Sequence, residues 1–410
     1  MRRSVAAVFA VLACVSLGLA QDRTAPPAAA APTPTPVDQP RVAATGDCAG
    51  GDCAADACRL WGSAEYLLGW TRGQLLPPLV TTSPAGTPVG TVGVLGQPTT
   101  TILYGNTHVN TEGRDGGRFE LGYWLNDCHD IGIGGSFMLL REARDEFHAM
   151  SAGDPILARP IFDTNAQTQA AQVIAFPGIA SGCLDISTFS QFLGAELFLR
   201  KKLCCTCKGQ LDVLVGYRFL ELRDGLTIDE LAASTTGGVD VTPLATSFAL
   251  TDSFVTQNRF HGGEVGLLYQ CCIDRWSIEA VGKVALGGTS QSTVIQGGTR
   301  VVVAGADPAD LPGGLLALGT NIGEHNNAAF SFVPELRLSI GYQLCCGVRA
   351  FVSYNFLYWT NVVRAGEQID LNIDPNNIPP TNGGGAQPTF PDRRNDFWLQ
   401  AIGIGISCKY

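Results

Sequence analysis

Most of the chain beyond residue 59 consists of runs in which apolar and polar side chains alternate. Successive side chains of a β-strand point to opposite faces, so a period of two predicts strands with one apolar and one polar face. Each of ten such runs is about long enough to cross a bilayer as a tilted strand of roughly 9 to 11 residues. The predicted strands are 60–70, 117–125, 130–141, 189–202, 210–221, 258–270, 275–287, 330–344, 348–359 and 396–407.

The connections between these strands alternate in length. Residues 126–129 join the second and third strands, and similarly short turns join the fourth to the fifth, the sixth to the seventh and the eighth to the ninth, whereas the other loops are long. This asymmetry is typical of outer-membrane β-barrels and has no reason to exist in a soluble sandwich. We therefore predict an all-β fold, an antiparallel transmembrane β-barrel of ten strands with short periplasmic turns and long outer loops. Two further strands within the loops, at 99–110 and 292–304, would make twelve.

Aromatic side chains on the apolar faces lie near the strand ends. Toward the short turns these are Tyr123, Tyr269, Trp276 and Tyr342, and toward the long loops they are Trp70, Phe189, Tyr217, Phe219, Tyr358 and Trp398. Amphipathic rings favour membrane interfaces, so the pattern predicts a girdle at each end of a lipid-facing band. Pro334 lies on the same face, and because proline cannot donate a ladder hydrogen bond it predicts a bulge or a strand end.

The opposite face of the strands carries charged side chains, which we predict to line the lumen. They are Glu65, Arg118, Glu120, Glu196, Arg200, Asp212, Arg218, Glu264, Glu279, Lys283, Glu335, Arg337 and Arg349, seven acids and six bases. A strongly selective channel would show one dominant sign, so this near balance favours pairs that neutralise one another across the lumen. A barrel of about ten strands is also narrow, whereas porins with aqueous channels usually have 16 or more.

The N-terminus has the features of a cleaved export signal. Arg2 and Arg3 precede an apolar run that ends in small residues before Gln21. The alternative, a lipoprotein site at Cys14, fits less well because Leu12 is unusual there and the apolar run would be very short. The predicted division is a signal peptide at 1–20, a Pro/Ala-rich, cysteine-containing periplasmic spacer at 21–57 and the barrel at 58–410.

The chain has 14 cysteines, of which 13 remain after removal of residues 1–20, and an exported protein so rich in cysteine is expected to form disulfides. Nearly all lie at the short-turn end, and Cys183 alone falls in an outer loop. The disulfide candidates are Cys128, Cys204, Cys205, Cys207, Cys271, Cys272, Cys345, Cys346 and Cys408. Because adjacent cysteines are too close for an easy bridge, we predict pairs between turns. These pairs are Cys128 with Cys204 or Cys205, Cys207 with Cys271, Cys272 with Cys345, and Cys346 with Cys408.

The sequence gives little support to metal binding or catalysis. The cysteines at 204–207 and at 48, 53 and 58 match no common zinc spacing, and an oxidising compartment disfavours free thiolates. No paired acidic motif accompanies the five histidines, and Gly263 follows His261 where an outer-membrane phospholipase would place a serine. We therefore predict no catalytic residue, metal or cofactor. The net charge of -10 also excludes a nucleic-acid partner.

Several segments carry a family resemblance in order along the chain. They are WGSAEYLLGW, LLPPLVTTSP, GVLGQPTTTILYGN, GRDGGRFELGYWL, IGIGGSFMLL, DPILARPIFD and VIAFPG. Together they resemble a bacterial outer-membrane β-barrel porin family whose first strand is of the SAEYLL type, over residues 60–410. The resemblance implies a single barrel in the outer membrane. It carries over no functional residues, because the activity of the family is itself inferred.

Two functions are consistent with this sequence. The first is passive transport of small polar solutes through a charge-lined lumen of an outer-membrane porin, and the alternative is a closed structural or surface-display barrel that acts through its outer loops. The expected partners are outer-membrane lipid and the barrel-assembly machinery, which would recognise the final strand with its aromatic end at Tyr410. The solute and the oligomeric state are left open.

Overall fold

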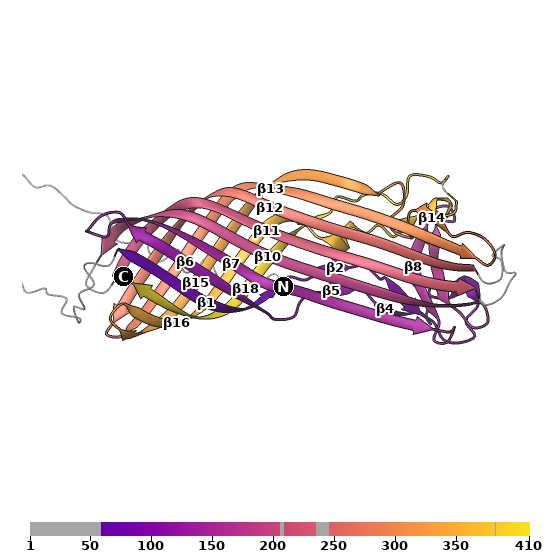
Figure 1. Cartoon of the computed structure of the whole chain (residues 1–410), viewed down its shortest axis with the longest axis horizontal. Helices are drawn as coiled ribbons and strands as arrows, with labels where there is room; N and C mark the ends of the chain where they lie inside the picture. The colour runs from indigo at the N-terminus through magenta and orange to yellow at the C-terminus, as the bar shows by residue number, and fades with distance from the viewer. Residues whose placement is uncertain (1–58, 206–208, 235–245, 382) are drawn as a thin grey trace, which may run out of the picture. The chain divides into compact units, whose positions relative to one another are not determined.

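The computed structural model describes residues 59–205, 209–234, 246–381 and 383–410. Ten long strands form one closed antiparallel sheet in the order β12-β11-β10-β7-β6-β1-β18-β16-β15-β13, and pairing of β12 with β13 closes the barrel (Figure 1). The strands are β1 (Leu60–Thr71), β6 (Arg114–Trp124), β7 (Ile131–Ser151), β10 (Ala180–Cys205), β11 (Gly209–Ser234), β12 (Thr246–Ile273), β13 (Trp276–Val303), β15 (Gly323–Cys345), β16 (Val348–Val363) and β18 (Arg394–Lys409).

The ten predicted strands and the barrel class are confirmed, and the twelve-strand alternative is wrong. Of its two extra segments, 99–110 forms only the short strands β4 (Thr101–Tyr104) and β5 (Thr107–Val109), which lie outside the barrel sheet. Segment 292–304 continues β13, which stays paired with β12 as far as Val303. Within the described residues no helix is long and apolar enough to span a membrane. The predicted signal peptide and spacer lie outside the described residues.

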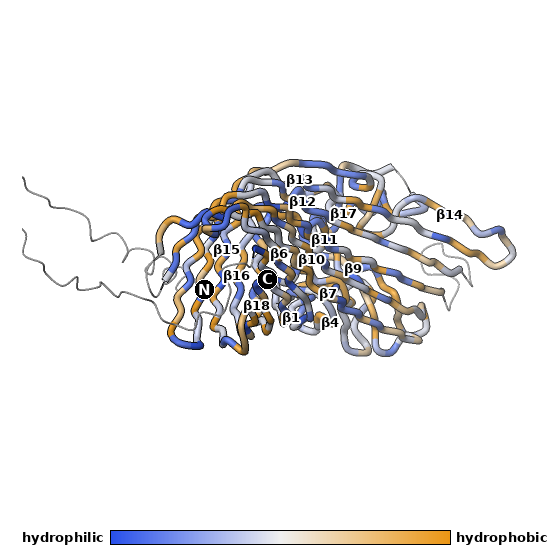
Figure 2. Tube along the Cα trace, turned by 60° about the vertical axis from the view of Figure 1, so that its left-hand side comes forward, coloured by the Kyte–Doolittle hydropathy of each residue, from blue (hydrophilic) through white to orange (hydrophobic). Residues whose placement is uncertain are grey.

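An apolar belt surrounds the part of the barrel next to the short turns, which we call the turn end; the opposite end is the loop end. On β18, Ile402, Ile404 and Ile406 point outward with 50, 65 and 51% of their surface exposed, whereas Ala401 is fully buried. Figure 2 shows the same change from residue to residue as alternating orange and blue along the strands. At the turn end the belt finishes in aromatic rings, where the exposed Trp276 packs edge-on against Tyr342 with ring centroids 5.1 Å apart. The belt is the lipid-facing surface that the sequence predicts.

Six strands continue past this belt and form what we call the wall. β7, β10, β11, β12, β13 and β15 have 21, 26, 26, 28, 28 and 23 residues, and at roughly 3.3 Å per residue the longest is much longer than a bilayer requires. The polarity of the two strand faces is exchanged in the wall, where the apolar side chains lie on the inner face instead of the outer face. On β11, Val215 points outward and Arg218 inward near the turn end, but Ile228 points inward near the loop end and is fully buried. The inner face of the wall is therefore apolar.

The long loops pack on that inner side and form what we call the cap. It contains β2 (Gln74–Leu76), β3 (Val80–Thr82), β4, β5, β8 (Leu157–Asp163), β9 (Thr168–Ala175), β17 (Asn372–Ile373) and the 3-10 helices η3 (Val89–Thr91), η4 (Ala365–Gln368) and η5 (Pro375–Asn377). The short strand β14 (Ala309–Pro312) instead pairs with β13 and extends the barrel sheet. Leu157 and Leu316 of the cap share one buried apolar cluster with Ile186, Ile228 and Phe254 of the wall. The loop end therefore has its own hydrophobic core.

Pro334 marks the end of one ladder. β15 continues through it and pairs Pro334 with Val284 of β13, but the ladder with β16 begins only at Glu335, opposite Leu357. Pro334, which has no backbone N–H, is thus the residue directly before the start of the ladder with β16. The prediction of a bulge or a strand end at Pro334 is therefore wrong for β15, which runs on to Gly323; only its ladder with β16 ends there.

Candidate functional site: the barrel interior

All thirteen charged side chains predicted for the lumen lie inside the barrel and contact other polar groups there. Each alternates with an outward-facing neighbour, as Arg218 does between Tyr217 and Phe219. Their side chains range from fully buried for Asp212 to 17% exposed for Arg349. The geometry therefore raises the question of whether these charges line an open channel or fill it.

The centre of the interior is a cluster around Arg218 of β11. Its guanidinium makes ion pairs with Glu196 of β10 at 2.5 Å, with Glu264 of β12 at 2.7 Å and with Glu335 of β15. Lys283 of β13 donates to Glu196 at 2.6 Å and lies 3.6 Å from Glu264. Strands β11 and β15 are not neighbours in the sheet, so the pair between Arg218 and Glu335 spans the lumen.

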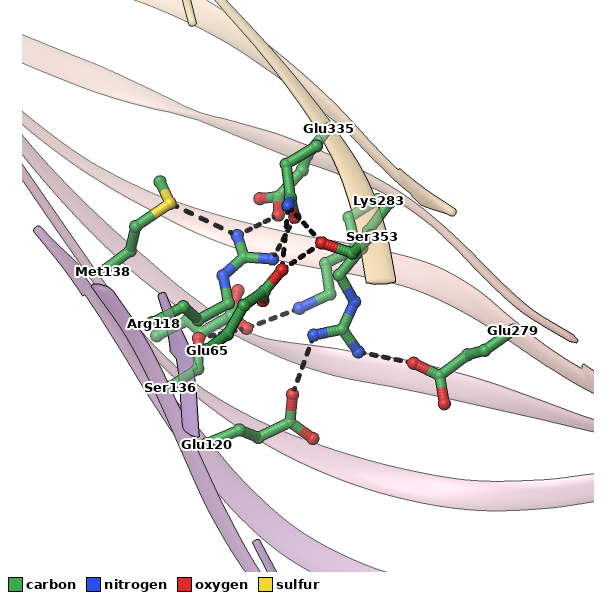
Figure 3. A network of polar contacts seen from close by, with 12 residues as sticks. Glu65, Arg118, Glu120, Ser136, Met138, Glu279, Lys283, Glu335 and Ser353 are labelled. Carbon is green, nitrogen blue, oxygen red and sulfur yellow. Dashed lines mark hydrogen bonds and ion pairs between the residues drawn. The ribbon is translucent and has the colours of Figure 1, made fainter. Parts of the chain in front are cut away.

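Arg118 of β6 extends the cluster to the opposite side of the barrel (Figure 3). It pairs with Glu335 at 2.5 Å and donates to Asn355 of β16 at 2.9 Å. Glu65 of β1 accepts hydrogen bonds from Asn355 and Ser353. Charges and amides from β1, β6, β10, β11, β12, β13, β15 and β16 thus meet in one network.

A second group of ion pairs lies nearer the turn end. Arg337 binds Glu279 at 2.7 Å and Glu120 at 3.4 Å, and Arg349 lies 3.6 Å from Glu279. The remaining pair joins Arg200 to Asp212 at 2.5 Å, and Gln270 connects it to Glu279. Arg200 also lies over the rings of Trp61 and Trp124, with centroid distances of 5.6 and 5.0 Å.

The interior has little free space between these side chains. Two cavities lie within the charged region, each with about 10 Å³ of room, which is about the volume that one water molecule needs. Trp61, Phe198 and Leu268 belong to an apolar cluster on the turn side of the charges, and Phe260 and Trp359 to another on the loop side. In this conformation the barrel is filled rather than open.

A separate ion cluster, which the sequence analysis missed, fastens the cap to the wall. Arg159 of β8 binds Glu230 of β11 at 3.1 Å and Asp252 of β12 at 2.7 Å, all three side chains being almost fully buried. The other oxygen of Asp252 accepts hydrogen bonds from three successive backbone N–H groups, at 315–317. Burial raises the pKa of Glu230, and Arg159 opposes that shift. An inward acidic residue on an extended strand is the signal that could have revealed Asp252, but the predicted strand began only at residue 258, whereas β12 begins at Thr246.

A second missed pair joins Arg364, beside η4, to Asp224 of the wall. Its guanidinium binds the Asp224 carboxylate and also donates to the backbone oxygen of Arg72 at 2.9 Å. Asn258 of β12 holds the same cap segment through Val363, accepting from its N–H and donating to its carbonyl oxygen, each at 2.8 Å. Buried ion pairs and amides therefore specify how the loops dock.

The disulfide pairs that the sequence predicted are not formed among the described side chains. The free thiols include Cys128, Cys204, Cys271, Cys272, Cys345 and Cys408. Cys346 is disulfide-bonded, but not to Cys408. The side chains of Cys205 and Cys207 lie outside the described part of the structure.

Register and strand order explain why these pairs fail. Cys408 faces Val348 on β16, and the ladder continues with Lys409 opposite Gly347, so Cys408 and Cys346 are offset by two residues. Cys272 and Cys345 belong to β12 and β15, which are separated by β13. Two strand spacings are about 9.6 Å, beyond the Cα separation of about 7 Å that a disulfide tolerates.

Three of the histidines make separate contacts in different parts of the molecule. His261 points outward and contacts Tyr217, while His148 pairs with Asp185 at 2.6 Å on the exposed face of the wall. His325 stacks on Phe390 in the cap. In the described ranges no group of three or more His, Cys, Asp and Glu side chains is arranged to hold a metal ion.

Together, the apolar belt, the closed antiparallel sheet and the charged interior define a transmembrane β-barrel. The family model described as "Putative beta barrel porin-7" matches residues 61–410, so the chain belongs to that family of porin-like outer-membrane barrels, and the resemblance found in its motifs is confirmed. No curated protein matches the chain.

Solved structures with similarity to the chain are also outer-membrane proteins. The outer-membrane protease OmpT of Escherichia coli is 9% identical, with 86% of this chain and 97% of that chain covered and a TM-score of 0.38. The TodX monoaromatic hydrocarbon channel, in a mutant form, is 8% identical, with 86% and 91% covered and a TM-score of 0.21; TodX is the toluene transporter of P. putida. At this level of similarity, neither activity is transferred to this chain.

Proposed function

We propose that the protein is a closed outer-membrane barrel that holds an ordered cap and wall at the cell surface and acts through them. The turn end faces the periplasm and the loop end faces outward, since this is how barrels with short turns and long loops are oriented. The observation that carries the proposal is the filled lumen, where cavities of about 10 Å³ lie among ion pairs that cross the barrel.

The order of the loop end supports a surface role. Closing a passage requires only a plug, whereas here the wall extends well past the belt and the cap adds a separate apolar core with its own buried ion pairs. Fixing long loops costs conformational entropy, which is offset only if many groups pack together. Such a surface presents a constant shape to the outside. No enzymatic activity, metal or cofactor forms part of this proposal.

The second candidate is a passive channel for small polar solutes. The charged interior and the porin-like family favour it. It requires the ion pairs around Arg218 to separate, and buried charges that lose their partners are costly. We therefore rank the channel below the closed barrel.

Single-channel recording in planar bilayers tests the choice. The protein is folded in detergent, its fold is checked by heat-modifiable migration on a gel, and an open porin inserted into the same membranes is the positive control. We expect the folded protein to insert without discrete current steps. Reproducible steps from folded protein would refute the closed barrel and establish the channel, and the lumen charges would then be the next positions to mutate.

We further propose that the barrel-assembly machinery recognises β18. The strand ends next to Tyr410, which is 70% exposed, and its outward face carries the row of isoleucines described above. Truncation of Tyr410 is expected to lower the amount of folded barrel in the outer membrane. Unchanged levels after truncation would contradict this assignment.

A further inference from the structure

Among the described side chains, four exposed free thiols surround the turn end, one in each short turn. Cys128 lies between β6 and β7, Cys204 at the end of β10, Cys272 near the end of β12, and Cys345 at the end of β15. We call these four the rim thiols. Cys271 and Cys408 are also free but less exposed, and each contacts a tyrosine, Tyr269 and Tyr410 respectively.

Two of the rim thiols, Cys128 and Cys345, lie on the aqueous side of the aromatic girdle. Cys345 follows Tyr342 and is nearer the tip of its turn than that ring, whereas Cys272 is exposed opposite Ser277, one pair behind Trp276. Cys128, like Cys345, lies beyond an aromatic ring, that of Tyr123. A thiol outside the bilayer is accessible to water-borne oxidants. With the periplasmic orientation proposed above, on which this inference rests, the compartment is oxidising.

Strand order limits pairing among the rim thiols of one chain. β13 separates Cys272 from Cys345, and the turns of Cys128 and Cys345 lie on opposite sides of β1, β18 and β16. Cys128 and Cys204 are closer, because beyond the last ladder pair, Ile131 with Lys201, Lys202 donates through its N–H to the Asp130 oxygen and through its ammonium to the Cys128 oxygen. Even so, Cys128 and Cys204 are both free, and each of the four thiols is exposed in its own turn.

We propose that the rim thiols are cross-linking sites that join neighbouring copies of this chain by disulfides below the membrane. Every copy is inserted in the same direction, so the rims of adjacent barrels lie at the same depth. Because the four thiols are in four different turns, a neighbouring barrel can meet a thiol on several sides. A soluble partner would not be held at this depth or in this orientation by the membrane. Links on more than one side of each barrel build an open network rather than a closed dimer.

The chemistry is thiol-disulfide exchange with a disulfide-bearing oxidant of the periplasm. The thiolate of one copy attacks the oxidant's disulfide, forms a mixed disulfide and releases one sulfur as a thiol. The rim thiolate of the second copy then attacks the protein sulfur of the mixed disulfide and displaces the other oxidant sulfur. In total, two rim thiols lose two protons and two electrons, and the oxidant is reduced to a dithiol.

Co-expression of two tagged versions of the full chain tests the proposal. Cells are treated with N-ethylmaleimide before lysis to block free thiols, the outer-membrane fraction is dissolved in hot detergent without reductant, and one tag is captured. Only a covalent link can then retain the other tag. We expect the second tag to be recovered together with a ladder of multimers on non-reducing gels, and both to disappear with dithiothreitol.

Two variants make the result specific. Replacing all four rim thiols by serine should abolish recovery of the second tag, whereas Cys183→Ser, a free cysteine on the wall, should leave it unchanged. Heat-modifiable migration in the outer-membrane fraction confirms that each variant is folded and located there, so failed export is distinguished from failed cross-linking. Monomers with alkylated rim thiols, disulfides within one chain only, or links to a different protein would each overturn the proposal.

Discussion

Arg218 is the position where the filled interior can be tested most directly. Its side chain is 4% exposed and pairs with three carboxylates, those of Glu196, Glu264 and Glu335. Arg218→Met keeps much of the apolar stem but leaves these acids with only Lys283 and Arg118 as nearby cations. Removing one partner of a buried pair typically costs about 3 to 5 kcal/mol, because the remaining charge is still desolvated. We expect a loss of that size in the free energy of unfolding.

The assay is denaturant unfolding of the barrel in detergent micelles, followed by tryptophan fluorescence and by heat-modifiable migration. Arg141→Met is the matched control, since Arg141 is 71% exposed and lies 3.6 Å from Asp115, and a surface pair is worth about 1 kcal/mol or less. Arg218→Lys should fall between wild type and Arg218→Met, because lysine keeps the charge but loses the planar fork. If Arg218→Met were as stable as Arg141→Met, the cross-lumen pairs would not hold the interior closed, and our reasoning would fail.

Three further predictions concern other parts of the molecule. Gly122→Ala should destabilise the barrel by about 1 to 3 kcal/mol, because the added Cβ would lie 2.0 Å from the Trp61 ring; Gly263→Ala, where no atom lies within 4 Å, is the control in the same unfolding assay. Arg159→Met should release the cap from the wall and speed proteolysis within 152–179 while the belt stays folded, and unchanged cleavage rates would contradict the anchoring role. Asp374 has its pKa lowered by the N–H groups of Gly385 and Asn376, so its stabilising effect is present above the ordinary value of 3.8 and is lost as pH falls through the lowered pKa; hydrogen exchange at 370–393 should rise there in wild type and depend less on pH in Asp374→Asn.

The membrane part of the fold could be predicted because one rule governs it. Lipid outside and charge inside impose a strict period of two, which is why residues such as Val215 and Arg218 were assigned to the correct faces. The wall was missed because that rule inverts: Ile228 faces inward although Val215 faces outward on the same strand. An inversion looks like a strand end when strands are recognised by a constant apolar face.

The candidate site was predictable in its membership but not in its contacts. Inward charges could be named from parity along each strand, yet the meeting of Arg218 with Glu335 depends on barrel closure and strand order. Arg159 and Asp252 could not be paired from the sequence because they come from a loop and from a strand extension. The disulfide prediction failed for the same reason, since register decides which cysteines face each other.

The unequal strand lengths also give the barrel a weak side. The ladders β6–β7, β1–β6, β15–β16 and β1–β18 have only 9, 10, 10 and 11 residue pairs, whereas β12 and β13 share 28. Separating two strands means breaking their ladder bonds, so a pulling force or a widening of the membrane should open the barrel at one of these short ladders before it separates the long ones. During insertion the same shortness helps, because closing the barrel between β1 and β18 needs few new bonds once the long strands have paired. The barrel is thus easiest both to complete and to open on the side where its first and last strands meet.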